Sequence, residues 1–131
     1  MKKYIAIFCF LLLLTAMVFS FSSCAKVEIA KGETIAVFQY GDTDIRKTMY
    51  EKDSETVRKI FHGKALSSRE ASCGFSENVA LVIDGNTYCI ACDSCGTVYH
   101  VEEDKYFYLS DKETETLHDL LYEYGFQFPC I

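Results

Sequence analysis

The residues best suited to chemistry in this chain lie close together, in the segment YCIACDSCGTVYH at positions 88–100. Cys89, Cys92 and Cys95 follow one another at intervals of three residues, and His100 ends the segment. Thiolates and imidazoles are common zinc ligands, a CxxC pair is the usual centre of a disulfide oxidoreductase, and cysteines also form structural disulfides. Metal binding, redox chemistry and disulfide formation are therefore the three hypotheses to separate.

A zinc site would use Cys89, Cys92 and Cys95, with Cys73 or His100 as the fourth ligand of a tetrahedral ion. The residues around Cys89 and Cys92 alternate as in a strand, however, and strand residues three apart point to opposite faces of a sheet. Cys89 and Cys92 are therefore not expected to reach one ion. We predict neither a metal nor another cofactor.

A redox site would use Cys92 and Cys95, which flank Asp93 and Ser94. A reactive CxxC motif usually begins a helix, whose dipole lowers the pKa of the first thiol. Here the motif is predicted to be a turn between strands, and the Asp93 carboxylate disfavours a thiolate. We therefore do not predict an enzyme. A thiol–disulfide oxidoreductase using Cys92 and Cys95, and a zinc protein using Cys89, Cys92 and Cys95, stay as alternative hypotheses.

Structural disulfides are the interpretation that this pattern favours most. The predicted topology places Cys73 and Cys95 at one end of the sheet and brings Cys130 near Cys89 at the other end. We predict the pairs Cys73–Cys95 and Cys89–Cys130, with Cys92 left on the face toward the core; Cys73–Cys92 is the close alternative. Each bridge closes a loop of about 20–40 residues and would contribute roughly 3–4 kcal/mol in the loop-entropy description.

The elements that must position these cysteines follow from apolar periodicity. Alternating β-branched and aromatic residues predict strands at 34–40, 45–50, 79–83, 87–92, 97–101 and 105–109. Asp84-Gly85-Asn86 predicts a hairpin turn between the third and fourth strands, because these residues accept positive φ. Helices are predicted after Asp53, as an N-cap, and after Ser110, which forms a capping box with Glu113.

This order, ββα-ββββα, predicts an α+β fold. We expect an antiparallel meander sheet with two helices packed on one of its faces, stapled by disulfides. Along the hairpin 79–92, Val79, Leu81, Tyr88, Ile90 and Cys92 should share one face, and Ala80, Val82, Cys89 and Ala91 the other.

The N-terminus has the layout of a bacterial secretion signal. Lys2 and Lys3 precede an uncharged apolar run from Tyr4 to Phe21, and Ser22-Ser23-Cys24 follows. The Ser-Ser-Cys ending resembles a lipobox, the cleavage site of bacterial lipoproteins. This resemblance covers only the first 24 residues and departs from the usual pattern at Phe21. It implies cleavage before Cys24 and acylation of the Cys24 thiol.

Three regions follow from this resemblance. Residues 1–23 are expected to be a signal peptide, residues 24–33 a lipidated tether, and residues 34–131 a single α+β domain. The domain is then expected outside the cytoplasm, attached to the cell membrane through its lipid. In such a compartment disulfides are the default state of paired cysteines.

The charge of the chain narrows the range of partners. Removing Lys2 and Lys3 leaves 11 basic and 19 acidic residues, a formal charge of −8. An acidic surface argues against nucleic acid and anionic lipid as partners, so the lipid anchor alone should make the membrane contact. We predict a binding or accessory module whose protein or peptide partner the sequence does not identify. A tyrosine-rich sheet face suits that role, and amphipathic core packing is the alternative explanation for the aromatic residues Tyr99, Tyr106, Phe107, Tyr108, Tyr122 and Tyr124.

Overall fold

A computed structural model of the chain describes residues 25–40, 42–72 and 79–126. Their order confirms the predicted α+β sequence of elements, with boundaries shifted by two residues at most on the strands. The elements are β1 (Thr34–Tyr40), β2 (Thr43–Thr48), α2 (Glu51–Phe61), β3 (Val79–Ile83), β4 (Asn86–Ile90), β5 (Thr97–His100), β6 (Lys105–Tyr108) and α3 (Asp111–Glu123). Within the described residues, no helix is long and apolar enough to cross a membrane.

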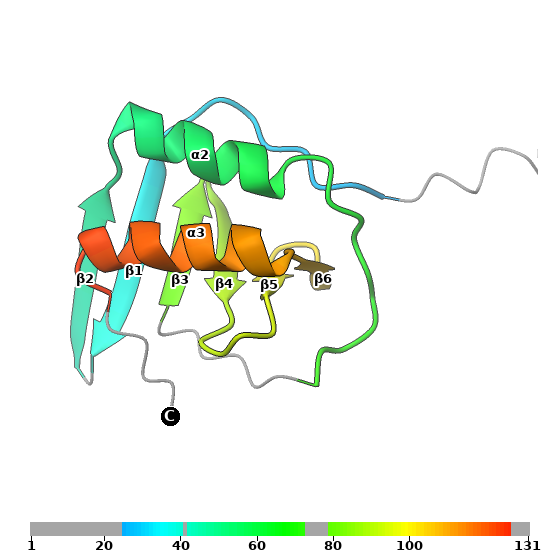
Figure 1. Ribbon diagram of the computed structural model, residues 1–131. Helices are drawn as coiled ribbons and strands as arrows, with labels where there is room; N and C mark the ends of the chain where they lie inside the picture. Colours follow the sequence, from blue (N-terminus) through cyan, green and yellow to red (C-terminus); the bar gives the residue numbers. More distant parts are fainter. Residues whose placement is uncertain (1–24, 41, 73–78, 127–131) are drawn as a thin grey trace, which may run out of the picture.

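The strands form one antiparallel sheet in the order β2-β1-β3-β4-β5-β6. From β3 to β6 the sheet is the predicted meander, because each strand pairs with the next. At the other end the prediction of a continuous meander is wrong, since β3 pairs with β1 and not with β2. Between β2 and β3 the chain forms α2, which lies across one face of the sheet (Figure 1), and β3 pairs with the edge of β1 that β2 does not use.

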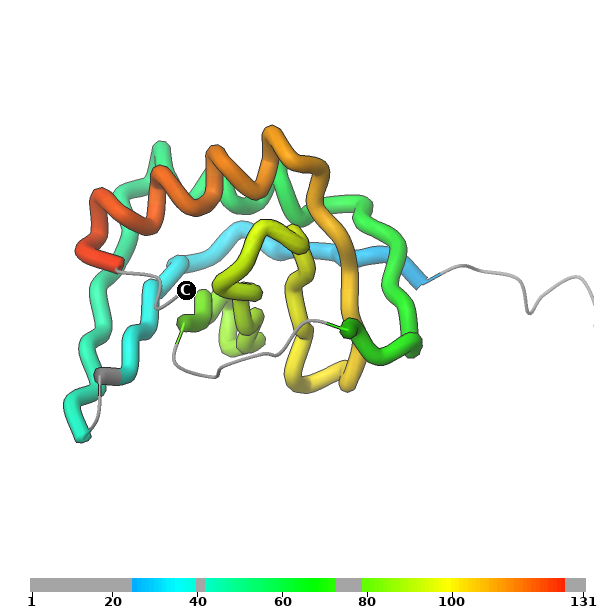
Figure 2. Tube along the Cα trace, turned by 60° about the horizontal axis from the view of Figure 1, so that its bottom comes forward, coloured from blue at the N-terminus to red at the C-terminus, as the bar shows by residue number. Residues whose placement is uncertain are grey.

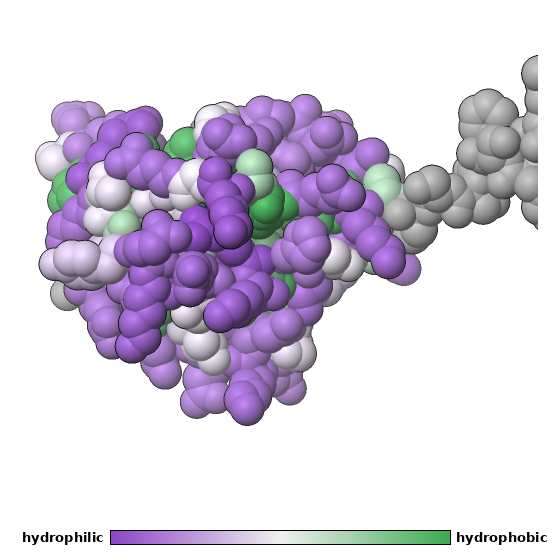
Figure 3. All heavy atoms as spheres, turned by 90° about the horizontal axis from the view of Figure 1, so that it is seen from above, coloured by the Kyte–Doolittle hydropathy of each residue, from purple (hydrophilic) through white to green (hydrophobic). Residues whose placement is uncertain are grey.

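Both helices pack on the same face of the sheet, as predicted (Figure 1). Alternate strand residues face this layer and are almost completely removed from water. The largest fully buried side chains of the core include Phe38, Leu81, Ile83, Tyr88 and Phe107 from the sheet, and Val57, Phe61, Leu117 and Leu121 from the helices. Seen from above, over α2, the surface is mostly hydrophilic with small apolar patches (Figure 3).

The two helices begin in different ways. Tyr50 is the N-cap of α2 and makes no side-chain cap, so the prediction of Asp53 as N-cap is wrong. The Asp53 carboxylate instead accepts a 2.6 Å hydrogen bond from the Tyr124 hydroxyl, which ties α2 to the end of α3. The predicted capping box of α3 is confirmed: Ser110 accepts from the Glu113 N–H, and Glu113 accepts from the Ser110 N–H.

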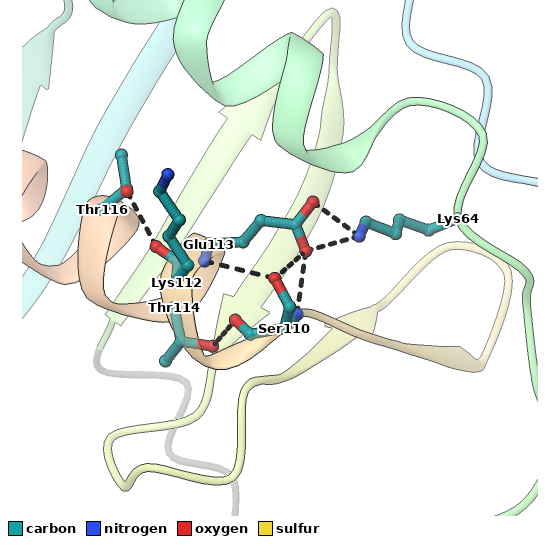
Figure 4. Close-up of polar contacts among 6 residues, drawn as sticks. All are labelled: Lys64, Ser110, Lys112, Glu113, Thr114 and Thr116. Carbon is teal, nitrogen blue, oxygen red and sulfur yellow. Dashed lines mark hydrogen bonds and ion pairs between the residues drawn. The ribbon is translucent and has the colours of Figure 1, made fainter.

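The capping box also joins the two helices. Lys64, just after α2, donates to both carboxylate oxygens of Glu113 at 2.7 and 2.6 Å (Figure 4). Burial opposes ionisation of Glu113, but the hydrogen bonds from Lys64 and Ser110 outweigh it and lower its pKa below the ordinary 4.5.

Residues 25–33, which we call the strap, do not form the tether that the sequence predicts. Val27 is 2% exposed and belongs to the core. The Val27 N–H donates to the Lys64 carbonyl at 2.8 Å, and the Gly63 N–H donates to the Val27 carbonyl at 2.8 Å. The strap runs beside α2 before it turns into β1 (Figures 1 and 2). In the described residues it is therefore part of the domain.

Candidate functional site

The three neighbouring cysteines line three different hollows of the surface. Cys89 lies in a hollow on the sheet face away from the helices. Cys92 lines a second hollow, against α3. Cys95 lines a third, with Ser67, residues 69–72, Thr97 and Tyr108. The zinc and CxxC hypotheses both need these side chains in one place, and in the described part of the chain no three His, Cys, Asp or Glu residues gather as a metal site.

The turn that holds Cys92 and Cys95 packs closely on the start of α3. β4 ends at Ile90, two residues earlier than predicted, so Cys92 follows the strand instead of lying in it. Gly96 has a φ of +62°, and a Cβ there would lie 2.6 Å from the Thr114 Oγ1. Glycine is required because the backbone both takes the left-handed conformation and approaches α3. Cys92 packs against the core, as predicted.

No disulfide joins two of the described cysteines. Cys89 and Cys92 are thiols, the first buried and the second half-buried. Within the described residues no pair of cysteines supports the disulfide-stapled part of the predicted fold, and nothing supports a bridge at Cys89, whereas Cys95 is disulfide-bonded. Cys73 and Cys130, the predicted partners of Cys95 and Cys89, lie outside the described residues, and the two pairings stay predictions.

No described helix lies on the second face of the sheet, and we call it the open face. Because directly paired residues of antiparallel strands share a face, the register traces one row across all six strands. The row runs Arg46, Val37, Ala80, Cys89, Tyr99 and Tyr106. Its centre is made of small side chains that are almost fully buried: Ala80 is 3% exposed and Cys89 is 2% exposed. The predicted sorting of Ala80, Val82 and Cys89 to one face is confirmed.

These small side chains leave a hollow of about 280 Å³ in the middle of the open face. Its lining is Val37, Gln39, Asp44, Arg46, Ala80, Val82, Thr87, Cys89 and Val101. Beside it, the rings of Tyr99 and Tyr106 stack with centroids 4.8 Å apart. The floor is thus apolar or neutral, and the aromatic pair follows it on the next two strands of the row.

Asp44 and Arg46 are the charged residues in the lining of this hollow. Arg46 Nε lies 3.4 Å from Asp44 Oδ2. Thr87, which also lines the hollow, donates its N–H at 2.7 Å to Glu102, whose carboxylate lies outside the lining and 3.6 Å from His100 Nε2. Burial opposes ionisation of Glu102, but this hydrogen bond outweighs it and lowers the pKa. A neutral floor inside a charged rim suits the apolar side chains of a partner, in the manner of protein interfaces.

The hollow at Cys92 has a different character. It measures about 570 Å³ and is lined by Cys92, Asp93, Ser94, Asp111, Thr114, Glu115, His118, Asp119 and Tyr122. Burial lowers the pKa of His118 below the ordinary 6.5, against a hydrogen bond to the Ala91 backbone and the charges of Asp119 and Asp93. Four carboxylates make this hollow electronegative, whereas reactive cysteines lie in electropositive surroundings.

Cys92 and His118 line the same hollow, which the sequence did not predict. No sequence signal could have found it, because the two residues are 26 positions apart and meet only when α3 packs beside the Cys92–Cys95 turn. Comparison with protein families, with curated proteins and with solved structures finds no match to this chain. The function is therefore argued from these surfaces.

Proposed function

We propose that this protein is a binding module, held outside the cytoplasm by an acylated Cys24, that binds a polypeptide partner on the open face of its sheet. The observation that carries the proposal is the row from Val37 through Ala80 and Cys89 to Tyr99 and Tyr106. A sheet needs one buried face to fold. In this sheet the buried face is the one that packs under the two helices, opposite the open face. The open face is thus available to a partner without loss of the core.

The composition of this face supports a polypeptide partner. Ile35, Val37 and Val82 are partly exposed around the small central residues, and tyrosines flank them. Tyrosine combines a large apolar ring with a polar hydroxyl and is enriched in the centres of protein interfaces. The hollow would receive one or two apolar side chains, and the rim charges would orient them.

The local surroundings argue against thiol chemistry as the primary function. Cys89 is buried at the floor of the open face, and Cys92 lies among four carboxylates. We retain the Cys73–Cys95 disulfide as part of the proposal. It is supported by the position of Ser72, which immediately precedes Cys73 and lines the same hollow as Cys95.

Photo-crosslinking in cells tests the binding surface. A photoreactive residue at Val82, on the open face, should yield a discrete protein adduct, and the matched exposed position Lys59 on α2 should not. Val37→Asp should reduce the Val82 adduct several-fold, because it places a charge on the apolar floor. Equal adducts at Val82 and Lys59 would contradict the proposed site.

The anchor is tested separately, by mass spectrometry of the mature chain. An acyl modification is expected on Cys24 and should be lost in Cys24→Ala. An unmodified Cys24 in the wild-type chain would remove the anchor from the proposal and leave the binding surface standing.

A further inference from the structure

The two outer edges of the sheet differ in how they are closed. At the β6 edge, Ser67 and Tyr106 exchange two backbone hydrogen bonds, of 2.7 and 2.8 Å. At the opposite edge, β2 is the last strand of the sheet (Figure 1). All six of its residues are exposed. Among residues 25–40, 42–72 and 79–126, no strand or bridge pairs with the outer side of β2.

The backbone groups on this outer side can be identified from one hydrogen bond. The Met49 N–H donates to the Thr34 carbonyl at 2.9 Å, so Met49 points its backbone groups toward β1. Backbone direction alternates along a strand, and Ile45 therefore also points inward. Asp44, Arg46 and Thr48 point their N–H and C=O groups outward, which is the arrangement that adds a further strand.

We propose that the partner of this edge is a second copy of the same chain, paired antiparallel through β2 with Ile45 at the two-fold axis. In that register Asp44 of each copy lies opposite Arg46 of the other, and two opposite-charge pairs form. A shift of two residues in either direction places Arg46 opposite Arg46, or Asp44 opposite Asp44. Charges on an edge strand usually prevent pairing. Here the order of Asp44 and Arg46 gives opposite-charge pairs in one register and like-charge pairs in the two registers shifted by two residues.

The side-chain surroundings agree with this register. Ile45 is an exposed apolar residue, 36% accessible, and would meet its copy across the axis. Asp44 and Arg46 lie on the open face and line its hollow. Pairing would therefore join two open faces into one continuous surface of twelve strands, with a hollow on each side of the seam. This inference does not depend on Cys24 acylation or on the identity of the partner of the open face.

A disulfide trap tests the register in the full chain in its membrane. Opposite residues of a non-hydrogen-bonded antiparallel pair have Cα atoms about 4.5 Å apart, which suits a disulfide. Ile45→Cys should thus form a covalent dimer under mild oxidation. In the matched variant Thr43→Cys, the two new cysteines would lie roughly four residues, or about 14 Å, apart and should not react. The unmodified chain gives the background from its own cysteines.

Charge reversal sharpens the test in the Ile45→Cys chain. Adding Asp44→Arg alone, or Arg46→Asp alone, places like charges at both pairs and should lower the dimer yield roughly tenfold. Both reversals together should restore it, and so should mixing the two single reversals. The Asp44 and Arg46 side chains are 50% and 58% exposed, so the fold should survive, which circular dichroism checks. Equal dimer yields for Ile45→Cys and Thr43→Cys, or yields insensitive to reversal, would overturn the proposal.

Discussion

The two faces of the sheet are built from the same strands but from different sizes of side chain. On β4, Tyr88 points to the helices and Cys89 points to the open face. The helix side is filled by rings, including Phe61, which lies 5.5 Å from Tyr88 and 5.1 Å from Phe107 between centroids. Among residues 25–40, 42–72 and 79–126, no second layer covers the centre of the open face, and its small residues leave a hollow. One strand thus serves stability on one side and, under the proposed function, recognition on the other.

The largest expected difference between the two sides comes from shortening one apolar side chain on each, Phe61 in the helix layer and Val82 on the open face. Phe61→Ala should lower the free energy of unfolding by about 3–5 kcal/mol, because Phe61 is completely buried and a cavity would remain. Val82→Ala on the open face should cost less than about 1.5 kcal/mol, because Val82 is only partly buried. Denaturant unfolding of both variants measures the difference. Equal losses would mean that the open face also forms part of the core.

A smaller effect is expected from the N-terminal cap of α3, one of the two helices that cover the sheet. Ser110→Ala removes the acceptor of the Glu113 N–H and should cost about 1 kcal/mol. The matched substitution Ser94→Ala, at an exposed turn residue, should be nearly neutral. Thermal unfolding of the two variants separates a capping effect from a general effect of losing a hydroxyl. Similar shifts in melting temperature would remove the assigned role of the cap.

The smallest effect concerns His100, the imidazole on the sheet face that packs under the helices. His100 is 8% exposed and stacks on Tyr88 with ring centroids 4.6 Å apart, and neither of its nitrogens has a hydrogen-bond partner in the described part of the chain. Burial lowers its pKa below 6.5, against the opposing charges of Glu102 and Glu103. The folded chain therefore binds the proton less readily than the unfolded chain. The contribution of neutral His100 to the free energy of unfolding should be fully present above pH 6.5, and it should be lost as the pH drops through the folded-state pKa.

The variant His100→Phe keeps the stack on Tyr88 and should flatten this part of the pH profile. The exposed His62→Phe is the matched control and should leave the profile as it is. Denaturant unfolding at a series of pH values gives the comparison, with the remaining slope due in part to His118. A His100→Phe profile that follows the wild type would show that His100 does not carry the proton linkage.

Local sequence signals predicted the helices and strands of this fold, but not every pairing between strands or the packing of the strap. The Asp84-Gly85 turn and the Ser110 capping box act within a few residues, and both were found from the sequence. Pairing of β3 with β1 depends on where α2 crosses the sheet, which no local pattern states. The strap was missed because AKVEIAKGE is short and largely polar. Contact with residues 63–66 and with Arg58, which donates to the Gly32 carbonyl at 2.9 Å, orders it.

The candidate site divides in the same way. Strand alternation correctly sent Cys89 to the face opposite Tyr88, because a strand has a fixed period of two residues. The same argument was applied to Cys92, although β4 ends at Ile90. Cys92 packs against the core because the turn after the strand rests on α3, as the close approach of Gly96 to Thr114 shows.

The docked strap has a consequence for how long the domain stays attached to a cell. Proteases that shed surface proteins cut exposed, flexible chain between the anchor and the fold. Here the Ala25 carbonyl already accepts a 2.9 Å hydrogen bond from the Leu66 N–H, and Val27 is buried two residues later. Under the proposed acylation of Cys24, a single peptide bond separates the lipid-bearing residue from this ordered backbone. Shedding would then require the strap to detach first, so release by proteolysis should be slow.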